Sequence, residues 1–140
     1  MLYLCFSLGS DEYALPADRV VQVLPNVPAK SVRGAPPPIV GSISYRGQFL
    51  PIVDLSMLEC GHPSIARIGT RLVVTDVRLA ERQERIGLLL ENATDTFRSE
   101  PVDFKPFAQG PRGLVQLFDI DSFLPATLFE GLGAEWARAV

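Results

Sequence analysis

Apolar and polar residues alternate in several short stretches of the chain, which is typical of half-buried β-strands. Residues 2–8 begin the pattern, with leucine or phenylalanine at every second position. The same pattern, or a short apolar run, predicts further strands at residues 12–15, 39–45, 48–55, 71–77, 86–90 and 114–120, and residues 94–97 extend the sheet. Residues 18–24 are compatible with a helical turn that continues as a strand. Eight or nine short strands predict a barrel or a sandwich.

Turn-forming and charged residues separate these strands. Arg46-Gly47 is expected at the tip of a hairpin, where glycine supplies a positive φ. Pro51, inside the second strand of that hairpin, indicates an edge position or a bulge. Residues 78–85 hold five charges of mixed sign and predict a solvated hairpin loop, and the proline-bearing residues 99–113 predict mostly loop.

Length and composition narrow the fold class to a mainly β protein. The chain of 140 residues is about one domain long. Its 12 prolines and 11 glycines exclude a bundle of long helices. Near the end, Asp121 or Ser122 is predicted to cap a short helix that starts near Phe123. Residues 132–140 are compatible with a further helix.

The charge balance and the cysteines exclude several function classes. Thirteen basic and sixteen acidic side chains give a net charge of −3, so a basic footprint for nucleic acid is missing. The sequence has no apolar run of 18 residues, which argues against membrane insertion. Two distant cysteines and the lack of a signal peptide predict a cytoplasmic protein with reduced thiols.

Candidate catalytic groups are few. Cys60-Gly61-His62 suggests a nucleophile with a base, or metal ligands, and Asp54 follows an apolar strand as a catalytic aspartate would. Zinc needs about four ligands, and the chain offers one histidine and two separated cysteines. We therefore predict no catalytic, cofactor or metal site. Two alternatives stay open: a small β-barrel enzyme using Cys60, His62 and Asp54, or a nucleic-acid-binding barrel suggested by the fold class and eight phenylalanines.

Residues 41–55, Gly-Ser-Ile-Ser-Tyr-Arg-Gly-Gln-Phe-Leu-Pro-Ile-Val-Asp-Leu, resemble the signature of the CheW-like domain family. That signature is a glycine, an apolar strand, an Asn-Leu-Arg-Gly turn and a Pro-Val-Val-Asp-Leu strand. Weaker matches lie at residues 6–15, 20–23, 86–91 and 117–121. The resemblance covers residues 4–124 of a single domain spanning 1–140, with 125–140 as a tail or helix.

The resemblance implies two intertwined five-stranded β-barrel subdomains and no catalysis. It implies an adaptor that couples a methyl-accepting chemoreceptor to a CheA-type histidine kinase in a chemosensory array. One surface would meet the kinase's regulatory domain, and a groove between the subdomains would meet the cytoplasmic tip of the receptor. The protein would thus be recruited to membrane-associated receptor arrays. Tyr45-Arg46-Gly47 and Asp54-Leu55-Ser56 also resemble adaptors of Wsp-type pathways, whose output is a diguanylate cyclase.

The resemblance also implies where partners bind. The expected contact residues are Val20, Gln22, Gly41, Ser44, Tyr45, Arg46 and Gly47. Each has a structural alternative. Arg46-Gly47 could be only a turn, Gly41 could only allow a bulge or a close strand approach, and Val20 could point into a core.

Four departures from the family pattern stand out. Ser44 and Tyr45 replace the asparagine and leucine of the turn, and Ser56 replaces an arginine. Gln22 replaces a glutamate that can pair with the arginine found here as Arg46, so partner choice is expected to change while the fold survives. Residues 108–113 occupy the place of a family strand, and the second barrel is expected to lack that strand or to have an open edge.

Overall fold

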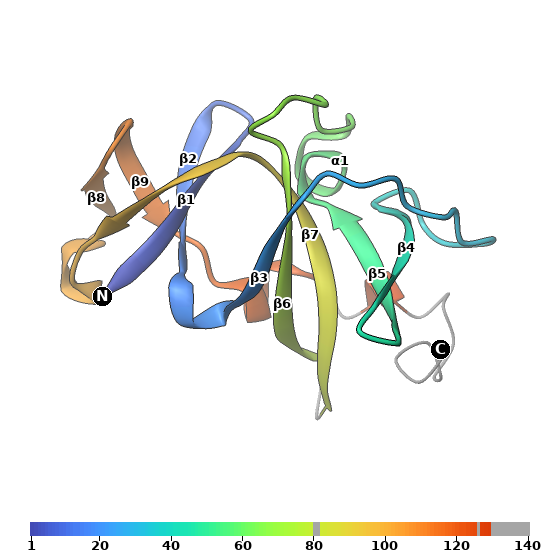
Figure 1. Ribbon diagram of the computed structural model, residues 1–140. Coiled ribbons are helices and arrows are strands. Elements are labelled where there is room, and N and C mark those ends of the chain that lie inside the picture. Colours follow the sequence, from blue (N-terminus) through green and yellow to red (C-terminus); the bar gives the residue numbers. More distant parts are fainter. Residues whose placement is uncertain (80–81, 126, 130–140) are drawn as a thin grey trace.

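In the computed structural model, which describes residues 1–79, 82–125 and 127–129, the chain is a mainly β protein whose strands form two units around one long strand (Figure 1). The strands are β1 (Leu2–Leu8), β2 (Asp11–Pro16), β3 (Val20–Pro25), β4 (Ile39–Tyr45), β5 (Gln48–Asp54), β6 (Arg71–Leu79), β7 (Arg82–Arg98), β8 (Phe107–Gly110) and β9 (Gly113–Leu117). The short helices are η1 (Ala17–Arg19), α1 (Leu55–Cys60), η2 (Pro101–Asp103) and α2 (Ile120–Phe123).

The strand β7 belongs to both units. Up to Leu90 it pairs with β6 and β5, and from Glu91 onward it pairs with β1. The first unit therefore has the strand order β7-β1-β2-β9-β8, and the second has β3-β6-β7-β5-β4. This confirms the expected pair of intertwined five-stranded units, although pairing among the described strands leaves each of them open. Asn92, with a φ of 52°, lies where β7 passes from one unit to the other.

Three hydrophobic clusters account for the apolar pattern. The largest lies between the units and takes side chains from both, among them Phe6 and Val73. A second cluster fills the second unit, with Leu72 and Val74 among its members, and a third fills the first unit around Tyr3. Because β6 sends alternate side chains into two different clusters, it is buried on both faces and reads as a continuous apolar run.

Residues 78–79 and 82–85 lie in strands and not in the solvated hairpin loop that their charges suggest. Strand β6 continues to Leu79 and pairs with β7 from Arg82, so the prediction of a loop was wrong for these residues. Asp76 lies directly opposite Arg85, and their side chains form an ion pair of 2.8 Å. Charged residues can occupy strand positions here because opposite charges face each other across the hairpin.

The expected missing strand is present. Phe107–Gly110 forms β8 and pairs antiparallel with β9. The prediction that residues 108–113 leave out a strand was therefore wrong. The prediction of a loop over 99–113 was wrong for residues 107–110 and 113. In the turn, Arg112 bonds Glu12 at 2.7 Å and Asp95 at 2.6 Å, which ties β8 and β9 to β2 and β7. The strand β8 still lies at the end of the strand order, as an edge strand.

The end of the sheet differs slightly from the prediction. The last strand ends at Leu117 and not at residue 120. The residue that caps α2 is Asp119, not Asp121 or Ser122. Its side chain accepts a hydrogen bond from the Asp121 backbone N–H at 3.2 Å. The helix predicted over 132–140 lies outside the described residues. None of the helices described within 1–79, 82–125 and 127–129 is long and apolar enough to cross a membrane.

Candidate functional site

The tip of the β4–β5 hairpin is a two-residue turn. Tyr45 pairs with Gln48, and the residues between them, Arg46 and Gly47, have φ values of 50° and 76°. Positive φ at both positions is the geometry of a type I′ turn, whose twist matches that of a hairpin. The predicted turn is confirmed, and it holds the Arg46 side chain in an exposed position. Along β5, pairing with β7 starts only at Ile52, so Pro51 lies where that side of β5 is an edge, as predicted.

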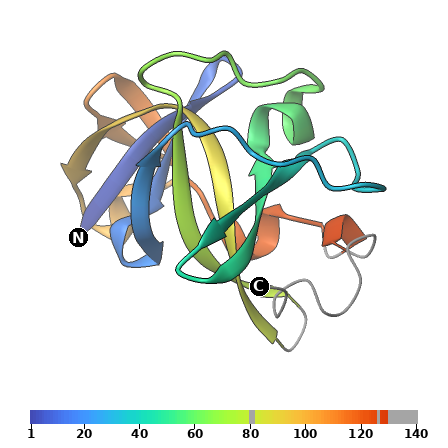
Figure 2. The same cartoon turned by 45° about the vertical axis from the view of Figure 1, so that its right-hand side comes forward.

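The structure brings Gln22 of β3 to this turn. The Tyr45 hydroxyl donates a hydrogen bond of 2.5 Å to Gln22 Oε1, and Arg46 Nη2 lies 3.5 Å from the same oxygen. The Arg46 guanidinium carbon lies 5.1 Å from the centroid of the Tyr45 ring, within cation–π range. In Figure 2 the hairpin tip lies near β3 at the front. We call Gln22, Ser44, Tyr45, Arg46 and Gly47 the hairpin patch.

Tyr45 joins the hairpin patch to the core below it. Its side chain is buried in the cluster that fills the second unit, while its hydroxyl reaches Gln22. Nearby on β7, Arg85 bonds Asp76 through two nitrogens, at 2.8 and 3.1 Å. This hydrogen bonding raises the pKa of Arg85 above its ordinary value. Sequence reasoning missed this pair because it assigned residues 78–85 to a loop.

Val20 does not lie on the exposed patch. A register shift in β3 between Val20 and Gln22 inserts Val21 as an extra residue. As a result Val20 packs against the core between the units and Val21 packs against the core of the second unit. The outward valine of β3 is Val23, which is 37% exposed.

Gly41 is buried at the other end of β4, beside the segment that contains Lys30. Lys30 and Ser42 exchange two backbone hydrogen bonds of 2.8 Å. A Cβ atom built on Gly41 would lie 2.5 Å from the Lys30 carbonyl oxygen. A register shift also occurs between Ile39 and Gly41. Both structural alternatives for Gly41, a bulge and a close strand approach, are therefore present, and its contact with a partner stays a prediction.

A shallow hollow lies between β3 and the connection that leads into β6. It has a volume of about 760 Å³ and is lined by Val23, Leu24, Pro25, Asn26, Ala66, Arg67, Ile68, Thr70 and Arg71. The Ile68 side chain is 93% exposed. The same connection reaches β7 at the junction of the units, where the Ala93 N–H donates to Gly69 O at 2.9 Å. We call this the β3 hollow.

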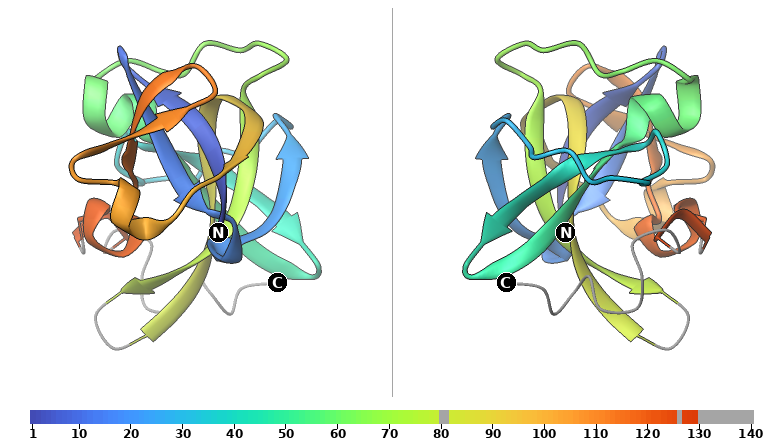
Figure 3. Two further views of the ribbon diagram at one scale, coloured as in Figure 1. Left: turned by 90° about the vertical axis from the view of Figure 1, so that its left-hand side faces the viewer. Right: turned by 90° about the vertical axis from the view of Figure 1, so that its right-hand side faces the viewer.

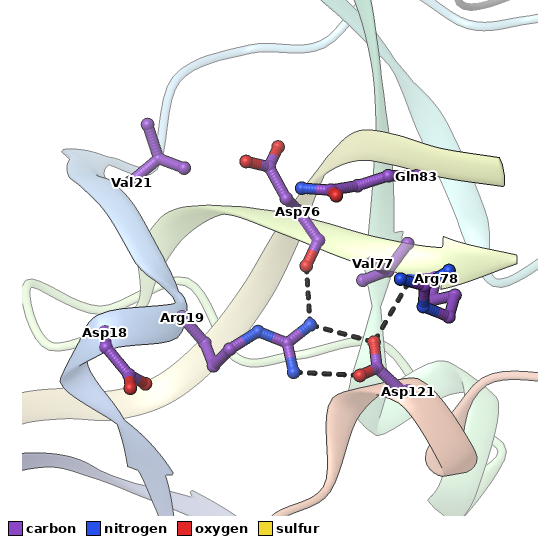
Figure 4. A pocket seen from close by; sticks show the side chains of 8 residues that line it. All are labelled: Asp18, Arg19, Val21, Asp76, Val77, Arg78, Gln83 and Asp121. Atoms are coloured by element: carbon purple, nitrogen blue, oxygen red, sulfur yellow. Dashed lines mark hydrogen bonds and ion pairs between the residues drawn. The ribbon is translucent and has the colours of Figure 1, made fainter.

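A polar pocket beside η1 is filled by an internal ion pair (Figure 4). Arg19 donates from two nitrogens to the two carboxylate oxygens of Asp121, at 2.9 and 2.8 Å, and also to the backbone oxygen of Asp76 at 2.7 Å. The Arg78 backbone N–H donates to Asp121 at 3.0 Å. Because the charges satisfy each other, we assign this pocket a structural role: it joins η1, β6 and α2.

The hydrogen bond from Arg19 holds the pKa of Asp121 below its ordinary value. An Asp with a lowered folded-state pKa contributes stability above its unfolded pKa, and the contribution is lost as pH falls through the folded pKa. Asp121→Asn is therefore expected to lower the free energy of unfolding by about 1 kcal/mol near neutral pH, since the pair is partly exposed. Urea unfolding at several pH values should show this difference shrinking below about pH 4. A constant difference would contradict the assignment.

The residues of the enzyme alternative do not form a catalytic arrangement. Asp54 is 1% exposed, and it accepts hydrogen bonds from Ser56 N, Ser64 N and Ser64 Oγ as the cap of α1. His62 Nδ1 lies 3.3 Å from Ser56 Oγ, but Asp54 makes no contact that would orient the imidazole as a triad requires.

The cysteines do not form a nucleophile–base pair among the described residues. Within the described part of the chain, no hydrogen bond joins Cys60 to His62. Burial raises the pKa of the Cys5 thiol to about 11, which disfavours the reactive thiolate. Among the residues that the structure describes, no group of three or more His, Cys, Asp or Glu is placed to hold a metal ion.

Comparisons with known proteins agree with the motif at residues 41–55. A family model described as the CheW-like domain matches residues 2–120. The chain is 27% identical over 143 aligned positions to the chemotaxis protein CheW of Rhizobium meliloti (strain 1021), covering 88% of this chain and 86% of that protein. The crystal structure of the scaffolding protein TtCheW from Thermoanaerobacter tengcongensis matches with a TM-score of 0.74 at 17% identity, covering 91% of this chain and 86% of that one. The latter likeness shows the fold.

Proposed function

This chain belongs to the CheW-like domain family, and from that premise we propose that it is a non-enzymatic adaptor that couples a methyl-accepting chemoreceptor to a CheA-type histidine kinase. The observation that carries the proposal is the match of one CheW-like domain over residues 2–120, which includes every strand of both units. Of the two proteins that it resembles, one is called a chemotaxis protein and the other a scaffolding protein, and the second name describes action by binding.

Two separate surfaces support coupling. An adaptor must hold two partners at once, so its contact surfaces must not overlap. The hairpin patch lies at the turn of β4 and β5, whereas the β3 hollow lies by the far end of β3, at Val23–Asn26. Gln22 belongs to the hairpin patch and the next residue, Val23, lines the β3 hollow, so both surfaces include residues of β3.

We assign the β3 hollow to the receptor. The connection that lines it reaches β7 at the junction of the two units, which fits the groove that the family resemblance implies, and its exposed Val23 and Ile68 offer apolar area to a partner. The regulatory domain of the kinase is assigned to the exposed surface outside the β3 hollow, which includes the hairpin patch, and the adaptor is recruited by these contacts to a membrane-associated array in the cytoplasm. The Wsp-type pathway stays a prediction from residues 45–47 and 54–56.

Ile68→Asp tests the assignment of the β3 hollow. We expect the dissociation constant for a receptor-tip fragment from the same genome to rise about tenfold or more, because a charge would replace apolar contact. The fold should not change, since the side chain is 93% exposed. Isothermal titration should show binding to the kinase regulatory domain unchanged within about twofold.

A matched control is Val102→Asp, which places the same charge on an apolar side chain of η2 that is 62% exposed, in the first unit. Its affinity for the receptor fragment should equal that of the unsubstituted chain. An equal loss of affinity for the receptor fragment in both variants, or no loss in Ile68→Asp, would contradict the assignment of the β3 hollow to the receptor. Failure of the unsubstituted chain to bind either fragment would contradict the proposed function itself.

A further inference from the structure

Resting on the proposed adaptor function, we propose that Glu91 of β7 is a positioning residue for the receptor. Its carboxylate holds the backbone of the connection between α1 and β6, and that connection presents Ile68 at the β3 hollow. Glu91 thus raises the affinity for the receptor tip without contacting it. Binding of the kinase regulatory domain, which is assigned to the surface outside the hollow, does not depend on Glu91.

The connection, residues 61–70, contains neither a strand nor an α-helix. It nevertheless exposes two apolar side chains, Ile65 at 49% and Ile68 at 93%. A loop that is not anchored loses conformational freedom when a partner binds to it, and this loss weakens binding. Hydrogen bonds that order the connection beforehand therefore raise its affinity for a partner.

Ile68 lies in a short turn that a chain of hydrogen bonds fastens to β7. The Thr70 N–H donates to Arg67 O at 3.0 Å, which closes the turn. The Thr70 hydroxyl donates to Ile65 O at 2.5 Å, and the Ile65 N–H donates to Glu91 Oε2 at 2.8 Å. A hydrogen bond to a carboxylate is about twice as strong as one between neutral groups. Removal of the Glu91 carboxylate would release the start of the turn.

Glu91 lies where β7 passes from one unit to the other. Pairing of β7 with β6 ends at Leu90, and Glu91 is paired with Ser7 of β1. The backbone of β7 also holds the connection near this point, through the bond from the Ala93 N–H to Gly69 O at 2.9 Å. This backbone bond fixes the end of the turn, so the side chain of Glu91 and the backbone of β7 hold its two sides.

Asp54 also holds the connection, but it cannot serve as the test. It accepts two hydrogen bonds from Ser64 and is buried as the cap of α1, so its removal would destabilise the fold as well. Glu91 is half-buried and belongs to no helix cap. A substitution there separates positioning of the connection from folding.

Glu91→Ala removes the acceptor of the Ile65 N–H, whereas Glu91→Gln keeps an acceptor oxygen. We expect the dissociation constant for the receptor-tip fragment to rise about fivefold in Glu91→Ala and to change by less than about twofold in Glu91→Gln. Both variants should bind the kinase regulatory domain like the unsubstituted chain. The matched control is Asp95→Ala, because Asp95 is another carboxylate of β7 and bonds Arg112 in the first unit at 2.6 Å. It should bind the receptor fragment like the unsubstituted chain.

Two further readouts separate positioning from a general structural role. Amide hydrogen exchange at Ile65 should be faster in Glu91→Ala, while exchange in the buried parts of β6 and β7 stays unchanged. Adding Glu91→Ala to Ile68→Asp should weaken receptor binding by less than about twofold further, because both changes act through the same turn.

The outcomes distinguish this inference from the adaptor function. If the unsubstituted chain binds the receptor fragment and Glu91→Ala binds it equally well, the inference is wrong while the adaptor function stands. An equal loss in Glu91→Ala and Glu91→Gln would also overturn the inference, because the negative charge and not the acceptor would then matter. So would an equal loss of binding to the kinase domain. If the unsubstituted chain binds neither fragment, both proposals are wrong.

Discussion

Gly41→Val is expected to lower the free energy of unfolding by about 3 kcal/mol or more, which would leave much of the chain unfolded. The added side chain would meet the Lys30 carbonyl oxygen at 2.5 Å and the Ala29 Cβ at 2.9 Å. The obstacle is backbone that is held by the two hydrogen bonds between Lys30 and Ser42, so it cannot move without breaking them. Gly41 also has a φ of 156°, which residues with a side chain rarely adopt.

Gly34→Val is the control for Gly41→Val. Gly34 also has a positive φ, 81°, but nothing lies within 4 Å of a Cβ built there. The Gly34→Val variant should therefore lose only the free energy of unfolding that backbone strain costs, about 1–3 kcal/mol. Urea unfolding followed by circular dichroism measures both. Equal stability of the two valine variants would contradict the close packing described around Gly41. If Gly41→Val unfolds as expected, a loss of partner binding in Gly41 variants would be explained by unfolding and would not show that Gly41 contacts a partner.

Asp54→Ala is expected to lower the free energy of unfolding by about 2–4 kcal/mol. The buried carboxylate caps α1 and also accepts two hydrogen bonds from Ser64, at 2.8 and 2.6 Å. Its removal leaves donors at the start of α1 and in the following connection without their acceptor. The same unfolding experiment measures the change.

Ser64→Ala is the matched control for Asp54→Ala, because it removes one of these bonds and keeps the cap of α1. It should cost about 1 kcal/mol. An Asp54→Ala variant as stable as the unsubstituted chain would contradict the structural role of Asp54. That outcome would return it to the candidates for catalysis.

Local signals explain which parts of the fold could be predicted. Alternation along residues 2–8 and the two-residue turn at Arg46-Gly47 each depend on neighbours in sequence, and both were found in the structure. The strand β8 could not be found in this way. It is four residues long, its Phe107 is exposed, and it is defined by pairing with β9. The continued pairing of β6 and β7 likewise depends on the contact of Asp76 with Arg85 across the hairpin.

The candidate site was predictable only in part. Resemblance to a known family named Gln22 and Arg46 together, and the structure places Gln22 Oε1 3.5 Å from Arg46. The hydrogen bond that Tyr45 donates to Gln22 had no signal, since the two residues are far apart in the chain and tyrosine replaces an apolar family residue. The bulge at Val21, which lets Val20 pack against the core, cannot be seen in the alternation, and contact of Val20 with a partner stays a prediction. The β3 hollow forms only when the connection after α1 packs near β3.

The β8–β9 hairpin faces the viewer in the left view of Figure 3 and the β4–β5 hairpin faces the viewer in the right view, so the two units present different ends of the molecule. A chain of this shape can bridge two proteins, as the proposed coupling of receptor and kinase requires. The direct measurement immobilises a receptor-tip fragment and asks whether the kinase regulatory domain is retained. We expect retention of the kinase domain only when this chain is added, and reduced retention with Ile68→Asp. Retention of the kinase domain without this chain would contradict the adaptor function. So would competition, in which the chain binds either partner alone but not both at once.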